Sequence, residues 1–219
     1  METQKEISEN QLVSKYIDIL LETGKQPASI YTFSKELGID ESTFYKHFSS
    51  FEHLEEKVFT LFFDNATSLL ENNEDFKDYD AKNKLLSLYF TYVEILTENR
   101  SYVLLALNDN KNSLKNLKKL EGLKKSFGHF INKLQIEKID FKQERIEKFQ
   151  ERGIQEVFWV QFLIILKFWM DDSSSVFEKT DVFIEKSIHA SFEIINTKPA
   201  KSFLDLGKFL LKEKMDFKF

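Results

Sequence analysis

The chain has 219 residues, enough for one large or two small domains with a sizeable core. It contains no cysteine, which excludes disulfides and thiolate metal sites, and its two prolines, six glycines and lack of strand alternation favour an all-α protein. The net charge of −5 lies entirely in residues 1–55, where five lysines stand against ten acidic side chains and no arginine occurs. This balance is unfavourable for neutralising phosphates, the main source of non-specific DNA affinity.

The N-terminal elements follow one another at short intervals. A helix is predicted from Ile7 to Thr23, with Gly24 as its stop. Ser29 is the expected N-cap of a second helix that ends at Gly38, where the backbone needs a positive φ. Asp40 is the expected cap of a short third helix. Two short helices joined by a glycine-containing turn predict a helix-turn-helix, the unit that lays its second helix in the DNA major groove.

The segment from Gly38 to Phe48, GIDESTFYKHF, followed by Leu54, resembles the recognition segment of the TetR family of bacterial transcription regulators. The most specific parts are the Gly38 turn and the Thr-aromatic-Tyr-x-x-Phe core that starts at Thr43. One departure is Phe51, which stands where the family usually has a lysine at the start of the fourth helix. The resemblance implies a DNA-reading head, an effector-binding body and a homodimer.

The expected DNA contacts lie on the two motif helices. Phosphates are expected to meet Ser29, Tyr45 and Lys46, and base edges are expected to meet Ser42, Thr43 and His47. Lys35 is expected to share the same face. Residues 1–50 would then form the helix-turn-helix domain, a helix at about 51–72 would link the domains, and residues 73–219 would form a ligand-binding and dimerisation domain.

Beyond the linking helix, residues 72–80 are polar and acidic and predict a loop. Helices are expected at 81–98 and 101–107, a break at 108–112, and one helix at 113–135 with a lysine-rich face. That face is interpreted as solvated, with a basic entrance for an anionic ligand as the alternative.

The last third is the most hydrophobic part of the chain. One long helix is expected from 141 to 170, a turn at 171–175, and further helices at 176–196 and 200–215. In the TetR family the last two major helices usually form the dimer, and the placement here is similar. The residues expected at a twofold interface are Ile165, Trp169, Ile184, Ile188, Phe192 and Ile195.

Phenylalanine is unusually frequent, with 23 residues. Core packing accounts for most of them, but a subset is expected to line a cavity for a small hydrophobic effector, with Tyr92 and Tyr102 as polar anchors. The residues proposed for this cavity are Phe62, Phe90, Tyr92, Tyr102, Phe158 and Phe162.

Enzymatic and metal-binding patterns are weak or absent. The four histidines lie on different predicted helices without partners at ligand spacing, so neither metal nor cofactor is expected. The N-terminus has no apolar signal segment, and the apolar run from Val157 to Met170 is interrupted and too short for a bilayer, which predicts a cytoplasmic protein with no membrane partner.

The sequence therefore predicts a homodimeric, ligand-responsive repressor that binds a palindromic operator in double-stranded DNA. The alternative is a protein of the same fold that has lost DNA binding and acts as a lipid- or partner-binding module. The acidic head, its lack of arginine and Phe51 favour this alternative.

Overall fold

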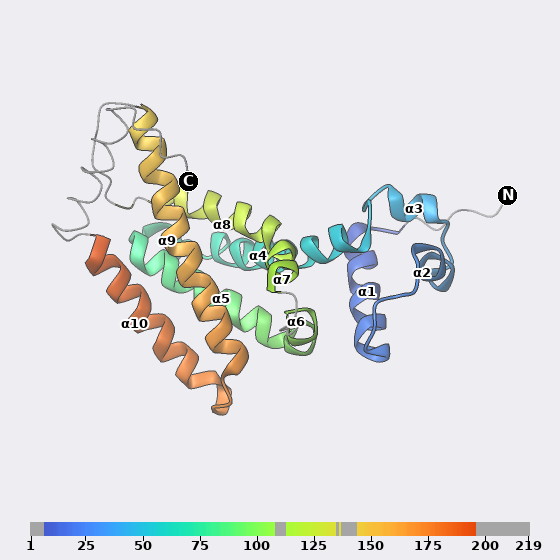
Figure 1. The fold of residues 1–219 in the computed structure, drawn as a ribbon. Helices are drawn as coiled ribbons and strands as arrows, with labels where there is room; N and C mark the ends of the chain where they lie inside the picture. Colours follow the sequence, from blue (N-terminus) through green and yellow to red (C-terminus); the bar gives the residue numbers. More distant parts are fainter. Residues whose placement is uncertain (1–6, 108–112, 135, 137–143, 196–219) are drawn as a thin grey trace. The chain divides into compact units, whose positions relative to one another are not determined.

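The structure is a computed structural model that describes residues 7–107, 113–134, 136 and 144–195. Regular structure in these ranges is helical throughout, as the composition predicts (Figure 1). The chain divides into two compact units, one formed by Met1–Asn65 and Glu94–Ser126, the other by Ala66–Val93 and Phe127–Phe219. The expected functional boundary near residue 50 stays a prediction, because the first unit joins the expected head to part of the expected body.

The first unit begins with α1 (Glu9–Thr23), α2 (Ile30–Leu37), α3 (Glu41–Tyr45) and the start of α4 (Phe51–Glu71) (Figure 1). Ser8 caps α1 through a reciprocal box with Gln11. Gly24 closes α1 and Gly38 closes α2, with φ of 67° and 69°, so both expected stops use the left-handed conformation that glycine adopts at little cost.

Four aromatic side chains hold these helices together. Phe33 of α2 lies edge-on to Phe44 of α3 and to Phe51 of α4, with ring centroids 5.9 and 5.6 Å apart. Tyr16 of α1 contacts Phe33 and Phe51 at 6.2 and 5.4 Å. All four are buried, so they fix the angle between the two motif helices.

The first unit also contains the end of α5 (Ala81–Glu98), α6 (Arg100–Leu107), α7 (Ser113–Lys119) and the start of α8 (Glu121–Lys133). The single helix expected at 113–135 is thus two helices, which meet at Leu120. Their separation lets Asn116 and Lys119 of α7 donate hydrogen bonds to the carbonyl oxygens of Leu107 and Ala106 at the end of α6.

Helices α4 and α8 approach closely at Gly122. A Cβ atom at this position would lie 2.6 Å from the hydroxyl oxygen of Thr60. That hydroxyl donates a 3.2 Å hydrogen bond to the carbonyl oxygen of Glu56, one turn earlier in α4. The spacing of the two helices therefore depends on the absence of a side chain at Gly122.

The second unit contains the end of α4, the 3₁₀ turn η1 (Glu74–Asp78) within the expected 72–80 loop, most of α5, the end of α8, α9 (Glu144–Asp171), η2 (Ser175–Phe177) and α10 (Glu178–Ile195). Helices α9 and α10 pack together (Figure 1). Phe158 contacts Phe192 at 5.6 Å, and the side-chain amide of Gln161 donates a 2.9 Å hydrogen bond to Ser191. The expected break at 108–112 and the helix at 200–215 lie outside the described residues, as does the start of the helix expected from 141.

The turn between α9 and α10 is held by the carboxylate of Asp172. Its Oδ1 accepts hydrogen bonds from the backbone N–H and hydroxyl of Ser174, and its Oδ2 accepts those of Thr180. Within the turn, Val176 and Phe177 have φ of 54° and 58°, a conformation that is rare for non-glycine residues. The Asp172 hydrogen bonds hold the chain on both sides of these two residues.

Candidate functional site

The residues expected at DNA lie at the N-cap of α2, within α2 and α3, and directly after α3. Ser29 caps α2 through a reciprocal pair of hydrogen bonds with Thr32, so its hydroxyl is occupied by its own helix. Asp40 occupies the N-cap position of α3, but its side chain makes no capping hydrogen bond. The backbone N–H of Ile39 donates to the carbonyl oxygen of Ser34, which together with the left-handed Gly38 closes the turn.

The motif side chains differ in exposure. Ser42, Tyr45 and Lys46 are exposed and His47 is half-buried, so these four are available at the surface of the unit. Thr43 is 7% exposed and lies mainly in the interior, which corrects the expectation that it faces base edges. Thr43 is therefore buried beside its neighbour Phe44, whereas Ser42 and Tyr45 on either side of this pair are exposed.

Charge is mixed around this surface. Lys35 on α2 is exposed, as is Lys25 in the turn before it, but Glu36 and Asp40 are exposed too. Phe51 is buried among aromatic rings, so the position where the TetR family usually has a lysine is part of the hydrophobic core here.

Sequence reasoning missed Tyr31, an aromatic side chain on α2 that is 58% exposed. The exposure of Tyr31 could have been expected from its position, because this aromatic residue lies outside the apolar stripe of α2.

The six residues expected around an effector fall into both units. Phe62 and Tyr102 meet in the first unit, with ring centroids 6.3 Å apart, and Phe59 lies 6.0 Å from Tyr102. Tyr102 is fully buried, and its hydroxyl has no hydrogen-bond partner among the described residues. Burial, together with the charge of Glu55, raises the pKa of Tyr102 far above its usual value, so the hydroxyl stays protonated.

The other four expected effector residues belong to the second unit. The ring centroids of Tyr92 and Phe162 lie 5.6 Å apart. Phe158 is fully buried and Phe90 is half-buried. The structure adds partners that sequence reasoning did not assign to this site. The ring centroid of Phe162 also lies 6.0 Å from that of Tyr89, 5.5 Å from that of Phe127 and 5.3 Å from that of Trp159.

Tyr89 has a different environment from Tyr102. Its hydroxyl donates a 3.2 Å hydrogen bond to the carbonyl oxygen of Phe158, and burial raises the pKa of Tyr89 well above its usual value. The spacing of Tyr89 from Tyr92, three residues along α5, was the signal that both share one helix face.

The dimer residues expected on α9 and α10 require correction. Ile165, Trp169, Ile184 and Ile188 are each at most 1% exposed within a single chain, so they form its core. Phe192 and Ile195 are half-buried. Pattern alone identified an apolar face correctly but did not show which of two apolar faces α9 turns inward.

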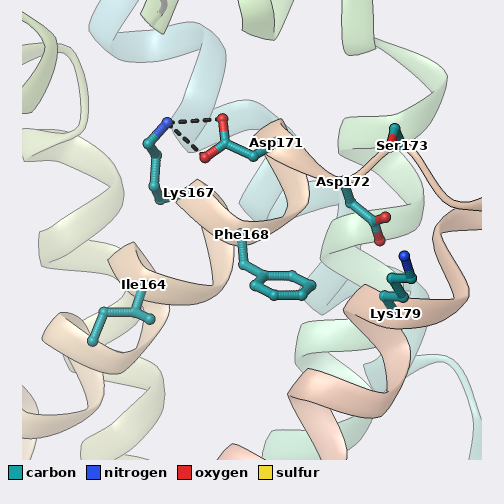
Figure 2. A pocket seen from close by; sticks show the side chains of 7 residues that line it. All are labelled: Ile164, Lys167, Phe168, Asp171, Asp172, Ser173 and Lys179. Atoms are coloured by element: carbon teal, nitrogen blue, oxygen red, sulfur yellow. Dashed lines mark hydrogen bonds and ion pairs between the residues drawn. The ribbon is translucent and has the colours of Figure 1, made fainter.

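Another face of α9 carries apolar side chains at helical spacing and remains exposed. We call this set the α9 stripe, and it consists of Val157, Val160, Ile164 and Phe168. Phe168 stacks on Phe183 of α10, with ring centroids 4.5 Å apart. At the end of the stripe, Figure 2 shows Ile164 and Phe168 on the same helix as the ion pair of Lys167 with Asp171. These four residues line a surface hollow of about 360 Å³.

The described part of the chain contains no group of three or more His, Cys, Asp or Glu side chains that is arranged to hold a metal ion. One segment, Glu151–Asp171, has the length and composition to cross a membrane, although sequence reasoning judged its apolar run too short. The interior helix of a soluble protein meets the same criteria, and this segment carries the buried Phe158, Phe162 and Trp169.

Comparison with known proteins supports the fold and its family. No curated protein matches the chain. Among solved structures, the fatty acid degradation regulator FadR from Bacillus halodurans has a similar fold, with a TM-score of 0.51, 16% identity, and coverage of 85% of this chain and 97% of the other. The family model described as "Tetracyclin repressor-like, C-terminal domain" matches residues 84–210, more than half of the chain. The chain therefore belongs to the tetracyclin repressor-like family of ligand-responsive transcription regulators.

Proposed function

We propose that this protein is a homodimeric repressor that binds a palindromic DNA operator and leaves it when a small hydrophobic effector binds. The observation that carries the proposal is the exposure of Ser42, Tyr45 and Lys46 directly after the Gly38 turn. Tyr45 and Lys46 suit phosphate contacts, and Ser42 and His47 suit base edges. Two heads in one dimer would read half-sites separated by one helical turn or a multiple of it.

The effector is proposed to bind among the buried aromatic residues. Tyr102 supports this because its buried hydroxyl lacks a partner within the described residues, and a polar group left in this state costs about 1–3 kcal/mol. An effector that accepts a hydrogen bond from this hydroxyl would recover that energy. The phenylalanine rings of Phe59 and Phe62 beside it favour an apolar ligand body.

The α9 stripe supports the proposed homodimer. Its four apolar side chains lie on a helix that already packs against α10 within the chain, so a second copy would cover them and complete a four-helix arrangement. We assign the dimer contact to this stripe, in place of the four buried residues that pattern reasoning chose. The proposal places the dimer in the cytoplasm.

The test is selection of bound genomic fragments at low and moderate salt, with the full-length protein. A repressor enriches a palindrome, and the logarithm of its affinity falls linearly with the logarithm of salt concentration. Long-chain fatty acids are suitable first effector probes, since the structurally similar FadR is described as a fatty acid degradation regulator. An operator complex that dissociates on adding a fatty acid supports the full proposal.

A second candidate function is a lipid- or partner-binding module that has lost DNA binding. The buried Phe51 favours it, because the usual lysine and its phosphate contact are missing at this position. The absence of arginine and the acidic excess in residues 1–55 favour it as well. Failure to enrich any sequence at either salt concentration, together with fatty-acid binding, would establish this function and exclude the repressor.

A further inference from the structure

The buried carboxylate of Glu55 in α4 connects α1, which supports the helix-turn-helix, to α7. The hydroxyl of Tyr16 in α1 donates a 2.7 Å hydrogen bond to Oε1 of Glu55 in α4. The Nζ atom of Lys119 in α7 lies 3.1 Å from Oε2 of the same carboxylate. Glu55 is 7% exposed and Tyr16 is fully buried, so each carboxylate oxygen of Glu55 has its own partner in the interior of the unit.

The connection continues from α7 to α6. Lys119 also donates a 3.1 Å hydrogen bond to the carbonyl oxygen of Ala106, in the last turn of α6. A positive charge is favourable there, because the carbonyl groups at the end of a helix carry a partial negative charge. We call Tyr16, Glu55, Lys119 and the carbonyl oxygen of Ala106 the Glu55 network; it joins α1, α4, α7 and α6.

The groups of the Glu55 network must keep specific distances and angles to one another. A buried carboxylate is stable only when it is paired and hydrogen-bonded, and removing one partner leaves an uncompensated charge. Burial, with the charge and hydrogen bond of Glu55, raises the pKa of Tyr16 far above its usual value, so Tyr16 remains a donor. Apolar packing in the same place would tolerate sliding of α1 along α4. The Glu55 network instead favours one arrangement, because each hydrogen bond restricts distance and angle.

Tyr16 also supports the motif helices directly. Its ring contacts Phe33 of α2 and Phe51 at the start of α4, while its hydroxyl binds Glu55. One side chain thus touches both the helix-turn-helix and the buried carboxylate. Any displacement of α1 that breaks the hydrogen bond also disturbs the packing beneath α2.

We propose that Glu55 is a positioning residue that holds the helix-turn-helix in one orientation relative to α6 and α7, and that separation of Lys119 from Glu55 releases it into a broader range of orientations with weaker operator binding. The part that concerns DNA rests on the proposed function. Glu55 and Lys119 line a hollow of about 740 Å³, so their side chains have space to separate without unfolding of the core.

The orientation can be measured without DNA or effector. Because the chain has no cysteine, Lys35→Cys on α2 and Ser101→Cys on α6 provide two spin-label sites at exposed positions of the same unit. Pulsed electron resonance on labelled chain diluted with unlabelled chain reports the distance distribution within one molecule. We expect a narrow distribution for the parent protein and a broader or shifted one for Glu55→Gln and Lys119→Met.

A matched control separates this role from general loss of a salt bridge. Lys57 of α4 pairs with Glu9 of α1 at 3.3 Å, between the same two helices as Tyr16 and Glu55, but both side chains are about one-third exposed. Exposed pairs contribute little, so Lys57→Gln should leave the distribution unchanged. Tyr16→Phe, which removes only the hydroxyl, is a second variant if Glu55→Gln fails to fold. Unchanged distributions in folded Lys119→Met and Tyr16→Phe would overturn the proposal.

Operator binding tests the second part of the proposal. If the competent orientation falls to between a tenth and a third of the population, apparent affinity falls about threefold to tenfold in Glu55→Gln and Lys119→Met. Affinity equal to that of the parent protein, despite a broadened distribution, would overturn the link to DNA. If the parent protein binds no DNA, the proposed function fails, and the distance measurement still decides whether Glu55 positions the helix-turn-helix.

Discussion

The carboxylate of Asp172 accepts two hydrogen bonds from Thr180, one from its backbone N–H at 3.0 Å and one from its hydroxyl at 2.7 Å. Thr180 lies in the first turn of α10, where backbone N–H groups lack partners within the helix. The other oxygen of Asp172 binds Ser174, whose hydroxyl accepts a hydrogen bond from the N–H of Lys179. Asp172 therefore supplies hydrogen-bond acceptors to the first turn of α10, although it lies eight residues before Thr180.

The Asp172 hydrogen bonds predict a loss of stability in acid. Burial alone would raise the pKa of Asp172, but the hydrogen bonds from Ser174 and Thr180 outweigh it and hold the pKa well below its usual range. Because the folded-state pKa is depressed, this stabilisation is fully present above about pH 4 and is lost as pH falls below that value. Asp172→Ala should lower the melting temperature at pH 7 by about 2–6 °C and flatten its decline below pH 4.

Asp171 is the matched control for that experiment. It is the neighbouring acid, and its partner is the exposed Lys167 at 2.8 Å. An exposed pair four residues apart on a helix contributes little, so Asp171→Ala should change the melting temperature by less than about 1 °C. Equal effects of the two substitutions would contradict the role assigned to Asp172.

Two glycines provide a test of the turn in the helix-turn-helix. A Cβ atom at Gly38 would meet no neighbour, so Gly38→Ala isolates the cost of a positive φ, about 1–2 kcal/mol of unfolding free energy. A Cβ atom at Gly153 would also meet no neighbour, but Gly153 lies inside α9 with ordinary helical φ, and Gly153→Ala should stabilise by about 0.5–1 kcal/mol. Denaturant unfolding measures both. Destabilisation of similar size at the two sites would show that backbone conformation is not the cause.

Two of the buried tyrosines, Tyr89 and Tyr102, should respond differently to loss of their hydroxyls. Tyr89→Phe removes a hydrogen bond to Phe158 and leaves that carbonyl oxygen with one partner fewer, which should destabilise the protein by about 1 kcal/mol. Tyr102→Phe removes a hydroxyl that has no partner in the described chain, and should leave stability unchanged or raise it. Once an effector is identified, Tyr102→Phe should weaken the binding of that effector about tenfold, and calorimetry measures this change. A large loss of stability in Tyr102→Phe without effector would count against the proposed anchor.

Lys46 gives a quantitative test of the proposed DNA surface. If its exposed ammonium group contacts a phosphate, Lys46→Ala should weaken binding by a similar factor on every sequence and reduce the slope of log affinity against log salt by about one. Lys133 of α8, an exposed lysine in the second unit, provides the control, and Lys133→Ala should leave the slope unchanged. An unchanged slope in Lys46→Ala would remove this residue from the DNA surface.

The α9 stripe predicts a substitution that separates the dimer. Ile164 is 53% exposed, so Ile164→Asp should leave the chain folded while placing a charge in the proposed interface. Sedimentation should then report a monomer at concentrations where the parent protein is dimeric. Leu105 of α6, also exposed, is the control, and Leu105→Asp should leave the mass unchanged. A dimer that persists in Ile164→Asp would place the interface elsewhere.

Much of the fold follows from local sequence signals. The stops at Gly24 and Gly38 and the cap at Ser29 depend on residues within a few positions of one another, and these local rules determined the first helices correctly. The break between α7 and α8 was not predictable in this way. Beside this break, Asn116 and Lys119 bind carbonyl oxygens of α6, and periodicity along one segment contains no information about such a partner.

The candidate sites were less predictable for the same reason. Helix α9 is apolar on more than one face, so periodicity identified Ile165 and Ile164 as equally hydrophobic without deciding which one is buried. The motif assigns Thr43 to DNA, whereas its side chain is buried in the structure. Glu55 carried no signal at all, because one glutamate in an acidic segment is ordinarily solvated, and only the distant Tyr16 and Lys119 distinguish it.

The hydrogen atom that takes the place of a side chain at Gly122 makes this position a sensitive point for engineering. A methyl group there would act as a wedge, forcing the Thr60 hydroxyl off the carbonyl oxygen of Glu56 or driving α8 outward. Glu56 adjoins Glu55 in sequence, so such a wedge would disturb the helix one residue from the buried carboxylate. A single added carbon would thus act on the same part of α4 that the proposed mechanism uses, without changing any charge in the protein.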